Sequence, residues 1–302
     1  MTNAYAEPVL RWYAAHARDL PWRRPEASPW SVLVSEIMLQ QTPVARVLPA
    51  HAAWLARWPT PPSLAAAAPG DAVRQWGRLG YPRRALWLHA AARILTDEHA
   101  GQVPASVQAL RELPGVGSYT AAAVASFAFG QRHVVLDTNV RRVLARLVRG
   151  VELPPRSTSA AEVALAEALL PAPPRRAARW SVAVMELGAL VCTAASPDCA
   201  GCPVARQCAW QRAGSPASAA RPAAQARYEG SDRECRGRLL GVLRDAAGPV
   251  PVAVLDDAWP DQIQRARALR TLVADGLAEA RDGDTYTLPG HGEARSEPAS
   301  RA

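Results

Sequence analysis

Residues 113–121 read Leu-Pro-Gly-Val-Gly-Ser-Tyr-Thr-Ala, a pattern typical of a tight turn between two helices. A helical pattern ends before Pro114, which lacks the amide hydrogen needed to continue a helix. Gly115 and Gly117 permit positive φ angles and the close approach of another chain, and a second helix is expected to begin near Ser118. The N–H groups exposed at the start of a helix suit a phosphate oxygen. A Gly-x-Gly turn alone is equally typical of an ordinary tight connection between helices, so the rest of the sequence has to decide.

Apolar residues recur at helical spacing through most of the chain before the C-terminal third. No convincing alternating strand precedes residue 245, so this part is predicted to be all-α. Thr42 is predicted to cap one helix, with Pro43 in its first turn. The other predicted helices lie around Val9–Tyr13 and Val32–Met38 and over 83–99, 106–113, 118–129, 138–149, 158–170 and 175–191.

The C-terminal part has a different pattern. Residues 213–229 are rich in Ala, Pro, Ser and Gly and are predicted to be a linker. Residues 230–290 are predicted to form a small winged-helix-like α+β domain, with a hairpin turn at Asp282-Gly283-Asp284, and 291–302 a disordered tail. The predicted elements of the domain are helices at 232–246 and 261–276, an apolar piece at 250–255 between them, and strands around 278–281 and 285–288.

Length and composition narrow the class of protein. At 302 residues the chain exceeds a typical single domain, so two or three units are expected. The formal charge of +8 suits a partner made of phosphates, although the basic side chains are all arginine, a bias also typical of genomic base composition. Because there is no lysine, no side chain can form a Schiff base with a sugar aldehyde. The N-terminal stretch lacks an apolar signal core, and no apolar run approaches the ~20 residues of a membrane span, so a cytoplasmic protein is expected.

Four cysteines are spaced as metal ligands. Cys192, Cys199, Cys202 and Cys208 form a C-x6-C-x2-C-x5-C pattern. In a reducing cytosol such a set predicts metal binding rather than disulfides. Four thiolates suit an iron–sulfur cluster, and zinc is the competing metal. Cys235 stands apart and is interpreted as an incidental thiol.

Taken together, the hairpin and the cysteines resemble the endonuclease III superfamily of helix–hairpin–helix DNA glycosylases over about residues 10–208. The resemblance implies a two-lobed helical fold and one 4Fe-4S cluster held by the four cysteines. The cluster lobe would comprise 1–27 with 137–212, and 28–136 would form a six-helix lobe containing the hairpin. It also implies that Asp137 is catalytic, although an aspartate there is also an ordinary helix N-cap.

Residues outside these shared parts indicate the branch. Residues 34–42, Val-Ser-Glu-Ile-Met-Leu-Gln-Gln-Thr, are similar to the adenine-specific MutY family, in which the glutamate at the place of Glu36 is the general acid. Apolar neighbours would raise the pKa of Glu36 and keep it protonated near neutrality, the alternative being a buried structural carboxylate. Residues 20–23 (Leu-Pro-Trp-Arg) and 185–192 also resemble that family. Tyr119 occupies the place of the lysine of the bifunctional endonuclease III branch, which removes lyase chemistry.

The resemblance therefore implies a monofunctional, monomeric, nucleoid-associated DNA glycosylase of base excision repair that excises adenine opposite 8-oxoguanine or guanine in duplex DNA. Glu36 would protonate the adenine, Asp137 would stabilise the cationic sugar, and Tyr119 and Asn139 would position carboxylate and water. The alternatives are a thymine/uracil mismatch glycosylase of the same superfamily and a non-catalytic DNA-binding protein. The implied DNA-binding residues are Gln41, Leu79, Tyr81, Gly115, Gly117, Trp22 and Arg23.

The C-terminal domain departs from the MutY pattern. Typical members of the family carry a β-rich domain with a Phe-Ser-His element, whereas no Phe follows residue 230 here. Pro82 also replaces the second tyrosine usual after Tyr81. The domain's arginines are predicted to add sequence-independent phosphate contacts, the alternative being a solvated helix face. These arginines are Arg233, Arg236, Arg238, Arg265, Arg267 and Arg270.

Overall fold

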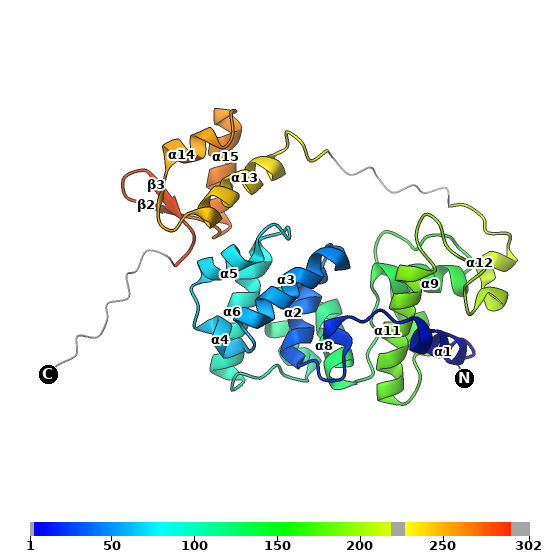
Figure 1. Cartoon of the computed structure of the whole chain (residues 1–302). Coiled ribbons are helices and arrows are strands. Elements are labelled where there is room, and N and C mark those ends of the chain that lie inside the picture. The colour runs from blue at the N-terminus through cyan, green and yellow to red at the C-terminus, as the bar shows by residue number, and fades with distance from the viewer. Residues whose placement is uncertain (1–2, 219–226, 291–302) are drawn as a thin grey trace. The chain divides into compact units, whose positions relative to one another are not determined.

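A computed structural model describes residues 3–218 and 227–290 and is mainly helical (Figure 1). The predicted disordered tail at 291–302 and much of the predicted linker lie outside the described residues. Helices precede the linker, in the order α1 Ala6–His16, the 3-10 helix η1 Pro21–Arg23, α2 Pro29–Leu39, α3 Val44–Arg57, α4 Pro61–Ala65, α5 Pro69–Trp76, α6 Arg83–Glu98, α7 Val107–Glu112, α8 Ser118–Phe129, α9 Thr138–Leu147, α10 Ala160–Leu169, α11 Pro174–Leu190, η2 Ala205–Gln207 and α12 Ala209–Arg212.

The chain divides into two compact units. The first, here called the cysteine unit, comprises Met1–Glu36, Pro104–Glu112 and Val116–Ala223. The second, the wing unit, comprises Ile37–Val103, Leu113–Gly115 and Ala224–Ala302. This division differs from the predicted lobes in three respects: residues 28–36 group with the cysteines, both helices of the hairpin do so too, and the C-terminal domain shares a unit with α3 to α6.

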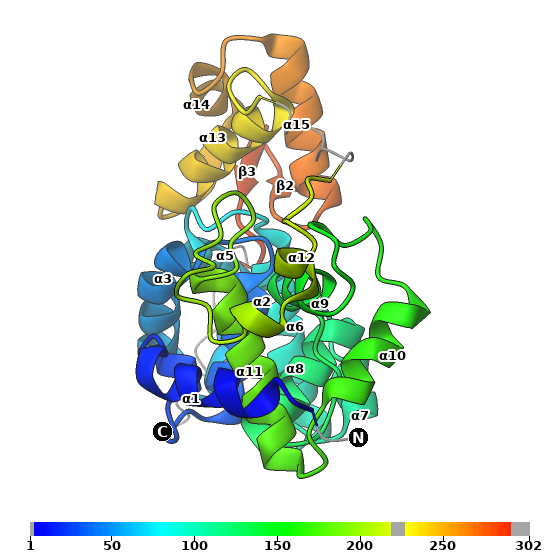
Figure 2. The same ribbon diagram turned by 90° about the vertical axis from the view of Figure 1, so that its right-hand side faces the viewer.

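Helix α11 is the central element of the cysteine unit. Figure 2 shows it beside α1, α8 and α9, and all three pack against it. Its buried face includes Trp180, Val184 and Leu187, which join residues of α1 and α9 in one apolar cluster. Gly188 lies where α11 meets α9, because a Cβ there would stand only 2.7 Å from the Cβ of Asn139. The two helices approach so closely that only glycine fits.

The C-terminal domain of the wing unit has the element order of a winged helix, as the sequence predicts. It contains α13 Asp232–Asp245, β1 Val250–Pro251, α14 Val252–Asp257, α15 Gln262–Ala274, β2 Glu279–Arg281 and β3 Thr285–Thr287. The strands form an antiparallel sheet in the order β1-β3-β2, with Tyr286 paired to both Val250 and Ala280. Gly283 and Asp284 have positive φ angles, which permits the predicted tight turn.

Some local predictions were wrong. Thr42 does not cap α3, because Pro43 occupies the N-cap position and no side chain bonds to the helix start there. The Thr42 hydroxyl instead donates to the Gln40 carbonyl at 3.4 Å. Helices α4 and α5 were not predicted, since Pro and Ala residues dominate that stretch and hide its short apolar periods.

We predict that Gly188→Ala destabilises the protein by roughly 1–3 kcal/mol, because the added methyl group would push α11 away from α9. Gly241→Ala is the matched control. Gly241 also lies inside a helix, but no atom stands within 4 Å of its Cβ position, so alanine should be neutral or stabilising there by up to about 1 kcal/mol. Thermal unfolding of both variants checks this. Equal effects of the two substitutions would contradict the proposed close contact.

Candidate active site

Glu36 is a buried carboxyl group on α2 with an exposed fraction of 6%. Burial raises its pKa to about 7. The guanidinium of Arg23 opposes this rise, the carboxylate of Asp137 adds to it, and a hydrogen bond from the Tyr119 hydroxyl opposes it. The structure therefore brings four of the sequence-predicted site residues together within the cysteine unit. At neutral pH a group with this pKa holds its proton about half of the time.

Asp137 caps helix α9, as its sequence context suggests. Its Oδ1 accepts the Val140 N–H at 2.6 Å, and its Oδ2 accepts the side-chain amide of Asn139 at 2.8 Å. Burial raises the pKa of Asp137, and the hydrogen bonds from Val140 and Asn139 lower it. The capping role and a charged role are thus compatible, because each bond favours the ionised form.

Arg142 connects this carboxylate to the cysteine segment. Its Nη2 donates to the Asn139 Oδ1 at 2.8 Å and to the Gly188 carbonyl at 2.7 Å. Its Nε donates to the Cys192 carbonyl at 2.7 Å. The close approach of α9 and α11 at Gly188 makes this arrangement possible. Asn139 is therefore held from both sides, and it fixes the orientation of Asp137.

A second buried carboxylate, Glu186 of α11, was not predicted as a site residue. Its side chain is fully buried and is held by Arg18 through Nε at 2.7 Å and Nη2 at 2.8 Å, and by Arg23 through Nη1 at 2.6 Å. Burial raises the pKa of Glu186, but the hydrogen bonds and charges of Arg18 and Arg23 outweigh it and bring the pKa to about 2. At neutral pH Glu186 is therefore ionised, whereas Glu36 is protonated about half of the time. Residues 185–192 resemble the MutY family, but sequence alone assigned Glu186 no role, because its partners lie more than 160 residues away.

The four spaced cysteines form no disulfides with one another, and all four line one open cavity. The fully buried Arg146 donates from Nη1 to the Cys192 sulfur at 3.5 Å, and its guanidinium lies 4.7 Å from the centre of the Trp210 ring. In the positions that the side chains adopt, no group of three or more His, Cys, Asp or Glu among the described residues is arranged to hold a metal ion. Four sulfurs around a shared space are nevertheless the donor set that a thiolate-ligated metal centre needs. Cys235 is buried in the C-terminal domain, apart from this cavity.

The hairpin turn differs in one detail from the prediction. Gly115 has a φ of +80°, and a Cβ there would lie 3.1 Å from the Cβ of Trp87, so this position requires glycine. The Gly115 carbonyl accepts the side-chain amide of Gln40 at 3.3 Å. Gly117 has a φ of −84° and therefore does not use the positive region. It is the exposed N-cap of α8, where no side-chain bond occupies the first amides of the helix.

Gln41 and Tyr81 share an unusual backbone. Their φ angles are +57° and +49°, a region that L-residues with side chains rarely adopt. Both side chains are exposed, that of Tyr81 by 50%. The Arg84 guanidinium lies 4.3 Å from the centre of the Tyr81 ring and also donates to the Gln40 carbonyl. Strain of this kind is typical of functional sites.

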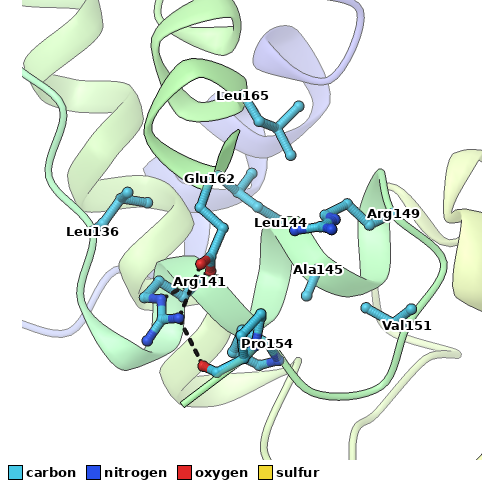
Figure 3. Close-up of a pocket in the computed structure, with 10 residues that line it drawn as sticks. Leu136, Arg141, Leu144, Ala145, Arg149, Val151, Pro154, Glu162 and Leu165 are labelled. Carbon is cyan, nitrogen blue, oxygen red and sulfur yellow. Dashed lines mark hydrogen bonds and ion pairs between the residues drawn. The ribbon is translucent and has the colours of Figure 1, made fainter. Parts of the chain in front are cut away.

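The structure does not expose every predicted DNA-binding residue. Leu79 and Trp22 are each 5% exposed, and Arg23 is engaged by Glu186. A separate small pocket in the cysteine unit, which includes none of the predicted site residues, is shown in Figure 3. At its edge the Arg141 Nε donates to Glu162 at 2.9 Å. That ion pair anchors α10 to α9 and gives no sign of chemistry.

Comparisons with known proteins agree with this picture. The family model described as HhH-GPD superfamily base excision DNA repair protein matches residues 34–166. An adenine DNA glycosylase of Mycolicibacterium smegmatis is 50% identical over 286 residues, which cover 94% of this chain and 96% of that protein. A thymine/uracil-DNA glycosylase of Pyrobaculum aerophilum is 34% identical over 205 residues, 67% of this chain and 88% of that protein. Among solved structures, a thermostable thymine-DNA glycosylase superposes with a TM-score of 0.63 at 27% identity, covering 69% of this chain and 95% of that one.

The hairpin between two helices and the family match define a base excision DNA repair protein of the HhH-GPD superfamily. Within that superfamily, the chain belongs to the adenine DNA glycosylase family, MutY. The resemblance found in the sequence is therefore confirmed at the level of the family. Among the described residues, no helix combines the length and apolar character needed to cross a membrane.

Proposed function

We propose that the chain is a monofunctional, monomeric adenine DNA glycosylase that acts in the cytoplasm at the nucleoid. Its substrate would be adenine paired with 8-oxoguanine or guanine in duplex DNA. The observation that carries the proposal is the pairing of Glu36, whose pKa is raised to about 7, with Asp137, whose oxygens both accept hydrogen bonds. Two neighbouring carboxyl groups in opposite protonation states are what hydrolysis of a glycosidic bond requires.

The proposed reaction begins with extrusion of the adenine, because its reacting atoms are inaccessible inside the base stack. Protonated Glu36 donates its proton to a ring nitrogen of the base. The N-glycosidic electron pair then leaves with the adenine as a neutral molecule, and positive charge develops on the sugar. Ionised Asp137 stabilises that charge until water adds to the sugar and loses a proton, which leaves an abasic site in an intact strand.

Neighbouring residues support these roles. The Tyr119 hydroxyl hydrogen-bonds to Glu36, and the Asn139 amide orients Asp137. Strand cleavage by a Schiff base is not expected, because the chain contains no lysine and Tyr119 stands at the position that would carry it.

For DNA recognition we propose a division between exposed and buried residues. The strained, exposed Gln41 and Tyr81 would contact the base opposite the extruded adenine, and the buried Leu79 would support the backbone near Tyr81. Main-chain N–H groups at Gly115 and Gly117 would bind a phosphate. Trp22 is buried and Arg23 is paired with Glu186, so these two residues would support the site that receives the extruded adenine and would not touch the DNA backbone.

We further propose that Cys192, Cys199, Cys202 and Cys208 hold one 4Fe-4S cluster. The cluster would supply a covalent cross-link that gives this loop a fixed shape, since the hydrolysis needs no electron transfer. The shared cavity and the Arg146 bond to the Cys192 sulfur support the proposal, and zinc is the alternative metal.

The function is tested by incubating the purified protein with duplexes that carry A:8-oxoguanine, A:G, T:G or thymine glycol:A. Release of adenine from the first two supports the proposal. The second candidate, a thymine/uracil glycosylase, is favoured by the Pyrobaculum relative and by the superposed structure. Release of thymine from T:G with no release of adenine would establish that candidate instead.

We predict that the single-turnover rate of the wild-type protein falls by up to tenfold per pH unit above pH 7, because Glu36 then loses its proton.

Glu36→Gln should bind an A:8-oxoguanine duplex with near-wild-type affinity yet release almost no adenine, since the shape is kept and the acid is lost. Rates from pH 5.5 to 9, with binding measured separately, check both points. A variant with near-wild-type rates would remove Glu36 from the mechanism.

We predict that the purified protein is yellow-brown and contains about four iron and four sulfide ions per chain, one iron per thiolate ligand. Cys202→Ser should lose iron and DNA binding together, whereas Cys235→Ser, outside the cavity, should lose neither. Metal analysis and absorbance spectra provide the measurement. A colourless, zinc-containing and fully active protein would refute the cluster.

A further inference from the structure

The C-terminal domain is attached to α5 of the wing unit by hydrogen bonds from two arginine side chains to main-chain carbonyls and by one main-chain bond. Arg74 of α5 donates to the carbonyls of Arg244 and Ala246, each at 2.9 Å. Arg244 returns a bond from its Nε to the Val73 carbonyl at 3.1 Å. Burial lowers the pKa of Arg244 to about 10, which shows how far this contact is withdrawn from water. At the start of α5, the Gly70 amide donates to the Pro289 carbonyl at 2.8 Å.

A second attachment joins the domain to the beginning of α6. Asp275, which follows α15, pairs with Arg83 of α6 at 3.3 Å and with Arg236 of α13 at 2.6 Å. The next residue, Gly276, lies close to α6, because a Cβ at this position would be 3.8 Å from the side chain of Leu86. One carboxylate thus bridges a guanidinium of the domain and a guanidinium of α6.

The net charge of the C-terminal domain argues against binding of DNA phosphates as its main role. Residues 227–290 contain nine arginines and eleven aspartates and glutamates, so the excess charge is negative. Four of the six arginines predicted to contact DNA are held by carboxylates instead, in the pairs Arg236–Asp275, Arg238–Glu234, Arg265–Asp256 and Arg267–Asp232. Most of the positive charge that the sequence suggested for a DNA contact is therefore paired with carboxylates of the same domain.

The two attachments enclose one loop. Val73 and Arg74 precede it, Arg83 follows it, and between them lies the segment 77–82 with the strained, exposed Tyr81. Within the loop, the Gly80 carbonyl accepts the Trp76 ring nitrogen at 2.8 Å, the Arg78 carbonyl accepts the Arg46 side chain, and the Tyr81 carbonyl accepts the Arg84 amide at 3.0 Å. These bonds act inside the segment or next to it, whereas the two attachments hold the helices at its ends. A positive φ at a tyrosine costs on the order of 1 kcal/mol or more and persists only when surrounding contacts enforce it.

We infer that the C-terminal winged-helix-like domain is a brace that holds both ends of the Tyr81 loop and thereby positions Tyr81 for DNA, with Asp275 as a positioning residue. The domain would act on recognition through the loop and without contacts of its own to the mispair. This inference rests on the proposed role of Tyr81 at the base opposite the extruded adenine.

The first test measures the loop directly, by amide hydrogen exchange of the full-length protein without DNA. Asp275→Asn removes the charge that bridges Arg83 and Arg236, so exchange in 77–82 should rise by on the order of fivefold. Asp232→Asn is the matched control, since it removes an Asp–Arg pair of 2.7 Å that lies wholly inside the domain. It should leave exchange in 77–82 unchanged. Arg74→Met releases the other end of the loop and should raise exchange in 77–82 to a similar extent. It replaces Asp275→Asn as the test variant if Asp275→Asn does not fold.

The second test asks whether the effect passes through Tyr81. Single-turnover adenine excision at subsaturating enzyme should fall about fivefold in Asp275→Asn and by less than about twofold when the same change is made in Tyr81→Ala. A purely structural role of Asp275 would give equal losses in both backgrounds. The wild-type and Tyr81→Ala rates show separately whether the proposed function and the role of Tyr81 hold.

Unchanged exchange in 77–82 in both Asp275→Asn and Arg74→Met would overturn the brace, whatever the activity. Equal losses of excision with and without Tyr81 would overturn its action through that residue. A wild-type protein that excises no adenine would overturn the proposed function, while the exchange measurement would still decide on the brace.

Discussion

The burial of the Glu36 carboxyl group is the constraint on which the rest of the site depends. A carboxyl group removed from water keeps its proton, and the structure raises the pKa of Glu36 to about 7. Glu36 keeps this raised pKa only if the nearby charges are fixed, because a cation that came closer would lower the pKa and ionise the group. Arg23 is such a cation, and the fully buried Glu186 holds it in a close ion pair. The fold thus raises the pKa of one carboxyl group and keeps a second one, the partner of Arg23, ionised.

Asp137 is likewise held by contacts that the fold itself needs. Burial raises the pKa of Asp137, and its two oxygens accept bonds from Val140 and Asn139 that favour the ionised form against this rise. Arg142 and the glycine at position 188 hold Asn139 in place between two helices. The proposed catalytic geometry therefore follows from helix capping and close helix packing rather than from a mobile loop.

Sequence reasoning succeeded where a local pattern carries the chemistry. The hairpin at 113–121, helix α8 and the winged-helix order could be read from glycine positions and apolar periodicity, and they were predicted correctly. The Glu186 ion pair could not be found, because its partners are distant in sequence and nothing local marks them. The phosphate contacts of the C-terminal arginines stay a prediction, and sequence alone could not show that four of these arginines pair with carboxylates of the same domain. The strained φ of Tyr81 is likewise invisible before the backbone is known.

The measurement that tests this account most directly is adenine release by Asp137→Asn. Asparagine caps a helix about as well as aspartate does, so α9 and the folded state should survive with a loss of stability below about 1 kcal/mol. The negative charge, however, disappears from beside the developing cation. The account predicts a single-turnover rate at least about a thousandfold below that of the wild-type protein at pH 7, with thermal unfolding and DNA binding nearly unchanged. A rate within tenfold of wild type would show that Asp137 is a helix cap and nothing more.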